Sequence, residues 1–150
     1  MNLRNNNGFT AADILISVIV LTIFIPTIFG VVYNVSKTNK AVVRESRAVG
    51  IATDILETAK STEVEDFNLE ETSRFNEALG LKNYSLQEND EESALYSYEG
   101  EDGEHYIINL NLAYPYDEEN ELVKTLTVNI EYPIGNTTKS IEISTVLKSN

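Results

Sequence analysis

"NNNGFTAADILISVIVLTIFIPTIFGVV", residues 5–32, is the stretch that decides the fold of this 150-residue chain. One acid, Asp13, stands directly before an apolar run that begins at Ile14 and ends at Val32. Fourteen of these nineteen residues are apolar and none is charged. About 20 such residues can cross the roughly 30 Å of a bilayer's hydrocarbon core. The run therefore predicts a single membrane span over residues 14–32 and leaves the rest of the chain to form a small soluble domain.

Composition excludes several classes of function. The net charge is −13, with 24 acidic against 11 basic residues, so we expect no nucleic-acid partner, because phosphate binding needs clustered Lys and Arg. The chain has no cysteine, which removes disulfides, thiol catalysis and zinc–thiolate sites. His105 is the only histidine, so no Ser–His–Asp or histidine–metal set is available. We expect neither enzyme activity nor a cofactor.

Acidic runs supply oxygen atoms that bind cations in other proteins. They occur at residues 90–92, 99–104 and 117–119. None has the spacing of a calcium-binding loop, with its Gly and its Glu at the twelfth position. The prediction for these runs is solvated turns, and a calcium site spread over two loops stays an open alternative.

The residues around Asp13 carry a resemblance to a known family. A short leader with Arg4 and the polar run Asn5 to Asn7 precedes Gly8, and the sequence GFTAAD then leads straight into the apolar run. This order resembles the N-terminus of type IV prepilins and secretion pseudopilins. The resemblance implies that residues 1–8 are a leader and that a prepilin peptidase cleaves between Gly8 and Phe9 and N-methylates Phe9. Asp13 stands where the family has glutamate, and its side chain is shorter by one methylene.

The same resemblance implies that Asp13 and Phe9 act in assembly. Cleavage would create an α-amine on Phe9, four residues before the Asp13 carboxylate, and unlike charges attract strongly where the dielectric is low. Helices packed side by side with an axial stagger could pair one subunit's amine with the next subunit's carboxylate. Two alternatives stay open: Asp13 caps the helix in the headgroup zone, or the run is an uncleaved signal anchor.

The basic residues give a conflicting signal about orientation. Lys37, Lys40, Arg44 and Arg47 follow the span, and only Arg4 and the initiator amine precede it. The positive-inside rule alone would place the C-terminal domain in the cytoplasm. We weigh the leader motif above this bias and expect an extracytoplasmic domain, with the four cations facing acidic neighbours in an assembly.

The helical pattern continues beyond the span. We expect residues 9–33 to form a transmembrane and assembly helix and residues 34–60 its amphipathic continuation. Apolar residues recur every seven positions at Val35, Val42, Val49 and Leu56, with Ala52 and Ala59 beside them. This repeat predicts an apolar stripe that packs on the domain. Pro26 is expected to kink or locally melt the helix.

The remaining residues predict a connector followed by a sheet. Residues 61–93 are expected to be an acidic connector with a short helix, capped by Thr72 or Ser73, running through Leu79 and ended by Gly80. Residues 84–93 have the composition of a loop. From residue 94 the apolar period changes to two, so residues 94–150 are expected to form the sheet domain. Strands are expected at residues 95–99, 105–114, 123–132 and 140–147, with turns at 100–103, 115–121 and 133–139.

These elements predict an α+β fold in which the long N-terminal helix covers the apolar face of an antiparallel β-meander of about four strands. Residues 126–147, LTVNIEYPIGNTTKSIEISTVL, resemble the end of minor pilins of the pilus-V type and of the minor secretion pseudopilin I.

Together the two resemblances imply a minor type IV pilin that takes part in pilus initiation, at the tip or in adhesion. A minor pseudopilin of a type II secretion or DNA-uptake system is the alternative, and an unprocessed single-pass protein with an extracytoplasmic domain is a second one. The implied partners are other pilin or pseudopilin subunits, the prepilin peptidase and the inner-membrane assembly platform. The implied location is the membrane before assembly and a cell-surface pilus or pseudopilus afterwards.

Overall fold

The structure, a computed structural model, describes residues 10–62, 67–100, 103–114 and 123–148. The chain divides into two compact units, Met1–Lys40 and Ala41–Asn150. Helix α1 (Ala11–Ser61) contributes to both, and α2 (Arg74–Leu81) and all five strands belong to the second unit. The α+β fold class predicted from the sequence is confirmed.

Helix α1 is 51 residues long and stays helical through Pro26. Of the two effects expected at Pro26, local melting does not occur, and the kink stays a prediction. Proline removes one backbone hydrogen bond and crowds the preceding turn, and side-chain hydroxyls and small backbone adjustments compensate for this in apolar helices. The carbonyl that Pro26 leaves without its helical N–H partner is that of Thr22, and the Thr27 hydroxyl donates to the next carbonyl, that of Ile23, at 2.8 Å.

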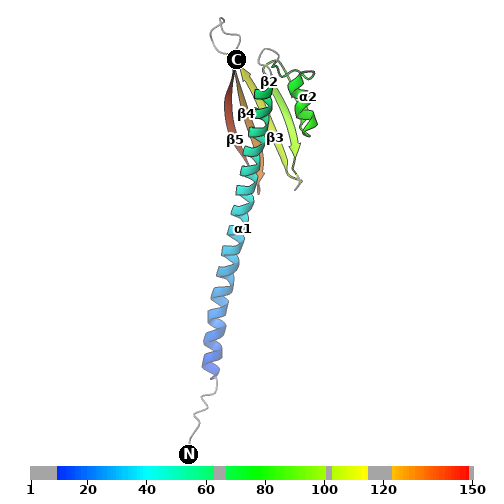
Figure 1. Ribbon diagram of the computed structural model, residues 1–150. Coiled ribbons are helices and arrows are strands. Elements are labelled where there is room, and N and C mark those ends of the chain that lie inside the picture. Colours follow the sequence, from blue (N-terminus) through cyan, green and yellow to red (C-terminus); the bar gives the residue numbers. More distant parts are fainter. Residues whose placement is uncertain (1–9, 63–66, 101–102, 115–122, 149–150) are drawn as a thin grey trace, which may run out of the picture. The chain divides into compact units, whose positions relative to one another are not determined.

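The five strands form one antiparallel sheet in the order β1-β2-β3-β4-β5, each pairing with the next along the chain (Figure 1). The strands are β1 (Ser85–Asn89), β2 (Ser93–Glu99), β3 (His105–Ala113), β4 (Val123–Ile134) and β5 (Thr137–Lys148).

The sheet has one strand more than the four or so expected. Strand β1 lies in the segment 84–93, for which a loop was expected, so that expectation was wrong. The strand has the sequence SLQEN, and its pairing with β2 shifts register between Leu86 and Glu88. A bulged, mostly polar edge strand has no period-two apolar signal.

The last turn is also tighter than expected. Strands β4 and β5 pair as far as Ile134 and Thr137, so only Gly135 and Asn136 connect them in place of the expected turn over 133–139. Gly135 has a φ of 61°, the left-handed conformation that two-residue hairpin turns require and that glycine adopts without strain. The two strands pair along their full length, from Val123 with Lys148 to Ile134 with Thr137.

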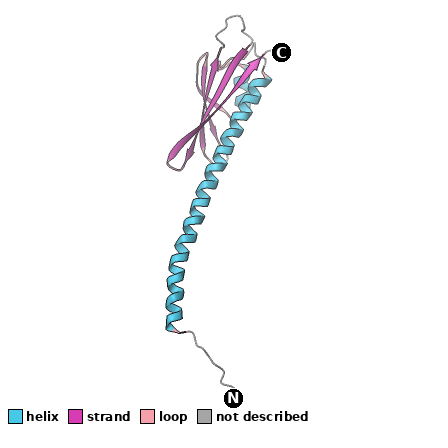
Figure 2. Cartoon of the chain, turned by 90° about the vertical axis from the view of Figure 1, so that its left-hand side faces the viewer, coloured by secondary structure: helices cyan, strands magenta, loops and turns pink. Residues whose placement is uncertain are grey.

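The core lies between one face of the sheet and the part of α1 in the second unit (Figure 2). Alternate residues of the central strands point inward, as the period of two predicted: Tyr106, Ile108, Leu110 and Leu112 from β3, and Leu126, Val128 and Ile130 from β4. The helix covers them with Ala48, Ile51, Ala52, Ile55, Leu56 and Ala59.

The predicted apolar stripe packs on the sheet only in its C-terminal part. Ala52, Leu56 and Ala59 are buried as expected, whereas Val35, Val42 and Val49 are exposed, with 42 % of Val49 accessible. A strict seven-residue repeat drifts by about 20° per repeat on a straight α-helix. The buried residues 48, 51, 52, 55 and 59 instead follow the spacing of three and four that one face of a single helix requires.

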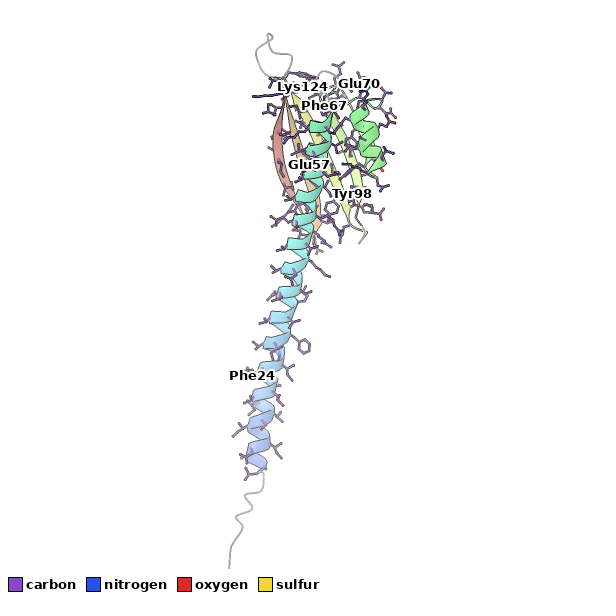
Figure 3. The ribbon with its side chains drawn as sticks, viewed as in Figure 1. Phe24, Glu57, Phe67, Glu70, Tyr98 and Lys124 are labelled. Atoms are coloured by element: carbon purple, nitrogen blue, oxygen red, sulfur yellow. The ribbon has the colours of Figure 1, made fainter. Side chains whose placement is uncertain are left out.

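Charged side chains hold the connecting segments to the core. Arg44 Nη1 donates to the carbonyl of Pro133 at 2.9 Å, and Arg44 Nη2 pairs with the Glu104 carboxylate. At the other end of the domain, Lys124 Nζ donates to the carbonyl of Phe67 at 2.7 Å, and Figure 3 shows the two residues close together. The sheet thus holds both helix α1, through Arg44, and the connector, at Phe67.

Helix α2 begins at a cap that the sequence indicated. Ser73, one of the two residues expected there, accepts the backbone N–H of Asn76 with its side chain at 3.2 Å. The helix ends at Leu81, one residue beyond Gly80, and Asn83 rather than Gly80 takes the left-handed conformation, with a φ of 66°. Asparagine tolerates this conformation better than most residues do.

The two faces of α1 predict different responses to truncation. Ile55 is fully buried, so Ile55→Ala is expected to lower the free energy of unfolding by roughly 2–4 kcal/mol through the cavity it creates. Val49→Ala removes two methyl groups from a side chain that is 42 % exposed and is expected to cost less than about 1 kcal/mol. Urea denaturation of the full chain in detergent, followed by circular dichroism, measures both. Equal losses of stability in the two variants would contradict the finding that Ile55 lies on the packed face of α1 and Val49 does not.

Candidate membrane and assembly site

Thr10 and Asp13 form a reciprocal cap at the start of α1. The Asp13 carboxylate oxygen Oδ2 accepts the Thr10 backbone N–H at 3.0 Å and the Thr10 hydroxyl at 2.7 Å, and the Asp13 N–H points back to Thr10 Oγ1 at 3.3 Å. This is a capping box, with aspartate in the place of the usual Glu or Gln. The carboxylate also complements the positive end of the helix dipole. The structure therefore shows a capping role for Asp13.

The cap leaves part of Asp13 available. Both hydrogen bonds to its carboxylate go to Oδ2, and among the described residues Oδ1 accepts none. The side chain is exposed. Gly8 and Phe9, the expected cleavage site and new N-terminus, lie outside the described residues. The cap expected from the sequence involved Asp13 alone; its partner Thr10 was missed, although the Thr-x-x-Asp spacing before an apolar run indicates a capping box.

The polar side chains within residues 14–32 form hydrogen bonds inside the helix. Ser17 Oγ donates to the carbonyl of Asp13 at 2.7 Å, Thr22 Oγ1 to that of Val18, and Thr27 Oγ1 to that of Ile23 at 2.8 Å. No water is available in hydrocarbon, so a spanning segment must satisfy its polar groups internally. These three hydroxyls fulfil that condition.

No other described part of the chain covers these residues. The large apolar side chains from Ile14 to Val32 are all exposed, Phe24 by 60 %, and α1 is the one helix of the described chain that is long and apolar enough to cross a membrane. Exposed apolar area on this scale has a large unfavourable transfer free energy in water. The helix is thus consistent with single-pass membrane anchoring.

The four cations after the apolar run do not share one environment. Arg44 is bound within the domain by Glu104 and the Pro133 carbonyl, so the expectation that it faces an acidic neighbour in an assembly was wrong. Lys37 and Lys40 are exposed and lie one helical turn apart. Because Arg44 has a structural role, its position after the span needs no explanation from membrane topology.

The other residues considered for chemistry do not form a site. His105 is exposed at the start of β3, and no group of three or more His, Cys, Asp or Glu in the described ranges could hold a metal ion. The Asp90 carboxylate is occupied by its own turn, where it accepts the backbone N–H groups of Glu92 and Ser93 and the Ser93 hydroxyl. These hydrogen bonds lower the pKa of Asp90 below its ordinary value, and the bond from the Ser93 hydroxyl has the largest effect.

Comparisons with known proteins find no match to this chain, whether to family models, to curated proteins or to solved structures. The architecture itself is a long N-terminal helix, apolar in its first half, packed in its second half on an antiparallel meander. That architecture is pilin-like, and it is the one the N-terminal resemblance implies.

The cap predicts a local effect of removing the Thr10 hydroxyl. Thr10→Val is expected to lose about 1 kcal/mol of local helix stability, which corresponds to roughly fivefold faster amide hydrogen exchange at Asp13 and Ile14. Thr27→Val removes a hydroxyl that donates within the same helix and serves as the control. Nuclear magnetic resonance of the full chain in detergent micelles measures the exchange rates. Unchanged exchange in Thr10→Val would mean that the capping box does not form.

Proposed function

We propose that this protein is a structural subunit of the type IV filament class, a minor pilin that is cleaved by a prepilin peptidase and incorporated into a pilus. The observation that carries the proposal is the order of features along one helix. The sequence Gly-Phe-Thr-x-x-Asp leads directly into an exposed apolar segment, and the same helix then forms one layer of a folded domain.

Each feature has a physical role in this proposal. The apolar segment inserts into the membrane and, after assembly, packs against the corresponding segments of neighbouring subunits, because both surroundings accept apolar side chains on every side of a helix. The sheet domain remains outside the cytoplasm. Partners are other pilin subunits, the peptidase and the inner-membrane platform that extracts subunits from the bilayer.

Asp13 has two successive roles in the proposal. Its Oδ2 atom holds the helix start through Thr10, and its free Oδ1 accepts the α-amine of Phe9 from an adjacent subunit once the leader is removed. The two roles do not compete, because a carboxylate has lone pairs on both oxygens. The pairing is strong only where lipid or packed helices exclude water.

The second candidate is a minor pseudopilin of a secretion or DNA-uptake system. It rests on the same N-terminal sequence and on the final strand pair, β4 and β5, whose sequence resembles both groups. The two candidates differ in where the assembled protein accumulates, on the cell surface or within the envelope.

Processing is tested by the mass of the mature protein. We expect native material to begin at Phe9 with one added methyl group, and a Gly8→Val variant to retain residues 1–8. Gly30→Ala is a matched control in the same helix, since an added Cβ at Gly30 meets nothing within 4 Å. Retention of residues 1–8 in the native protein would reject the pilin and pseudopilin proposals together and leave the unprocessed anchor.

The charge of Asp13 is tested separately from its capping role. Asp13→Asn keeps an acceptor oxygen for the Thr10 cap and removes the charge, so it should insert normally but enter filaments at least about tenfold less, because removing one partner of a desolvated charge pair costs roughly 2–5 kcal/mol. Asp13→Glu should assemble well. Quantifying the subunit in sheared filaments measures this.

A third variant at this position decides between the two roles. Asp13→Ala removes both the cap and the charge. If Asp13→Asn assembled like the native chain while Asp13→Ala failed, the carboxylate would act only as a cap and the pairing would be wrong.

A further inference from the structure

The part of α1 that directly follows the apolar run is locally positive in an otherwise acidic chain. The protein has 24 acidic residues, and none of them lies between Asp13 and Glu45 in the sequence. Three cations, Lys37, Lys40 and Arg44, fall within that interval. Arg44 is bound within the folded domain. The other two are exposed, and neither forms an ion pair with a described residue.

The two lysines continue a line of aromatic residues along one side of the helix. Positions three and four apart on an α-helix are neighbours, and this spacing joins Phe29, Tyr33, Lys37 and Lys40 into one stripe within the first unit. Phe29 and Tyr33 are each 70 % exposed. Along this stripe an apolar ring is followed by a ring with a hydroxyl, and then by two ammonium groups. A bilayer changes in the same order, from hydrocarbon through the interface to the charged headgroups.

The position of the lysines along the helix matches the headgroup layer. At about 1.5 Å per residue, Lys37 and Lys40 lie about 8 Å and 12 Å beyond Val32 along the helix axis. The headgroup region adds roughly 5–8 Å to each side of the hydrocarbon core. Side chains on an α-helix tilt toward its N-terminus, which on α1 is the direction of the apolar run. Both lysine stems therefore start in the direction of the bilayer surface.

Charge selects the kind of lipid that fits this stripe. With residues 14–32 in a bilayer, headgroups surround the stripe, because no other described part of the chain covers it. A zwitterionic headgroup presents its phosphate together with a cation of its own, whereas an anionic headgroup presents an uncompensated negative charge. Lysines near a membrane surface attract anionic lipid, and this part of α1 has no carboxylate to repel it.

We propose that Lys37 and Lys40, aligned with Tyr33 on α1, bind anionic phospholipid headgroups in the leaflet at the C-terminal end of the apolar run. The lysines fix the depth of the helix in the bilayer and enrich anionic lipid on this side of the span. The inference rests on the membrane anchoring of residues 14–32 and concerns the chain before assembly. It does not depend on cleavage or on the filament function.

The test uses a single fluorophore on the stripe. The chain has no tryptophan, so Phe29→Trp places one among the acyl chains that belong to headgroups near the lysines. The full-length variant is reconstituted at physiological salt in equimolar phosphatidylcholine and phosphatidylglycerol. Bromine, a contact quencher, is carried by the acyl chains of one lipid or of the other. We expect stronger quenching by brominated phosphatidylglycerol, with a relative binding constant about tenfold in its favour.

Charge variants in the Phe29→Trp background identify the lysines as the cause. Lys37→Gln and Lys40→Gln should each lower the preference about threefold, and the double variant should abolish it. Lys37→Arg keeps the charge and should keep the preference. Lys60→Gln changes an exposed lysine in the last turn of α1, far along the helix from the stripe, and should have no effect.

A second reporter tests the assignment to one side of the helix. Val31 is 58 % exposed, and it lies at nearly the depth of Phe29 on the opposite side of the helix. At physiological salt, charges act over about 8 Å, so Val31→Trp should report a smaller preference for the anionic lipid. Equal quenching by the two lipids at Phe29→Trp, or an equal loss in Lys60→Gln and Lys37→Gln, would overturn the proposal. Absence of quenching by either lipid would overturn it together with the membrane anchoring.

Discussion

The structure depends on a single helix that meets two different surroundings. Residues 14–32 expose apolar side chains around the helix, and nothing in the described chain covers them. Residues 48–59 bury one side only, against the sheet. A uniformly apolar surface is stable in lipid or among other such helices, whereas a one-sided face is stable on a water-soluble domain. The composition of α1 therefore suits its first part to lipid or to other apolar helices, and its second part to one face of a water-soluble domain.

The helix start connects this constraint to assembly. A charged residue beside a span is tolerated when hydrogen bonds satisfy it, and the Thr10 cap does this for half of the Asp13 carboxylate. In the proposed filament the other half is satisfied by a group that another chain supplies. The acid is thus stable in the isolated protein and still able to bind in the assembly, which a fully paired carboxylate would not be.

Features with a strong local signal could be predicted from the sequence. Local periodicity of apolar residues predicts three features: the apolar run, the helix through residue 60, and the inward residues of β3 and β4. Strand β1 could not be predicted, because a polar edge strand with a bulge is defined by its pairing with β2 and not by its own sequence. The packing face of α1 was predicted correctly at Ala52, Leu56 and Ala59 and wrongly at the valines before them, because which apolar residues are covered depends on where the sheet lies. At the candidate site, the bonds that Thr10 donates to Asp13 were missed, although the Thr-x-x-Asp spacing before an apolar run indicates them.

The central claim is that residues 14–32 lie in the membrane and the sheet domain lies outside the cytoplasm. The chain has no cysteine, so single-cysteine variants report accessibility without interference: Ser140→Cys on β5, which is exposed, and Ser17→Cys within the apolar run. The measurement is labelling by a membrane-impermeant maleimide in right-side-out and inverted membrane vesicles. The account predicts that Ser140→Cys is labelled only in right-side-out vesicles and that Ser17→Cys is labelled in neither until detergent is added. Labelling of Ser140→Cys only in inverted vesicles, or of Ser17→Cys in intact ones, would contradict it.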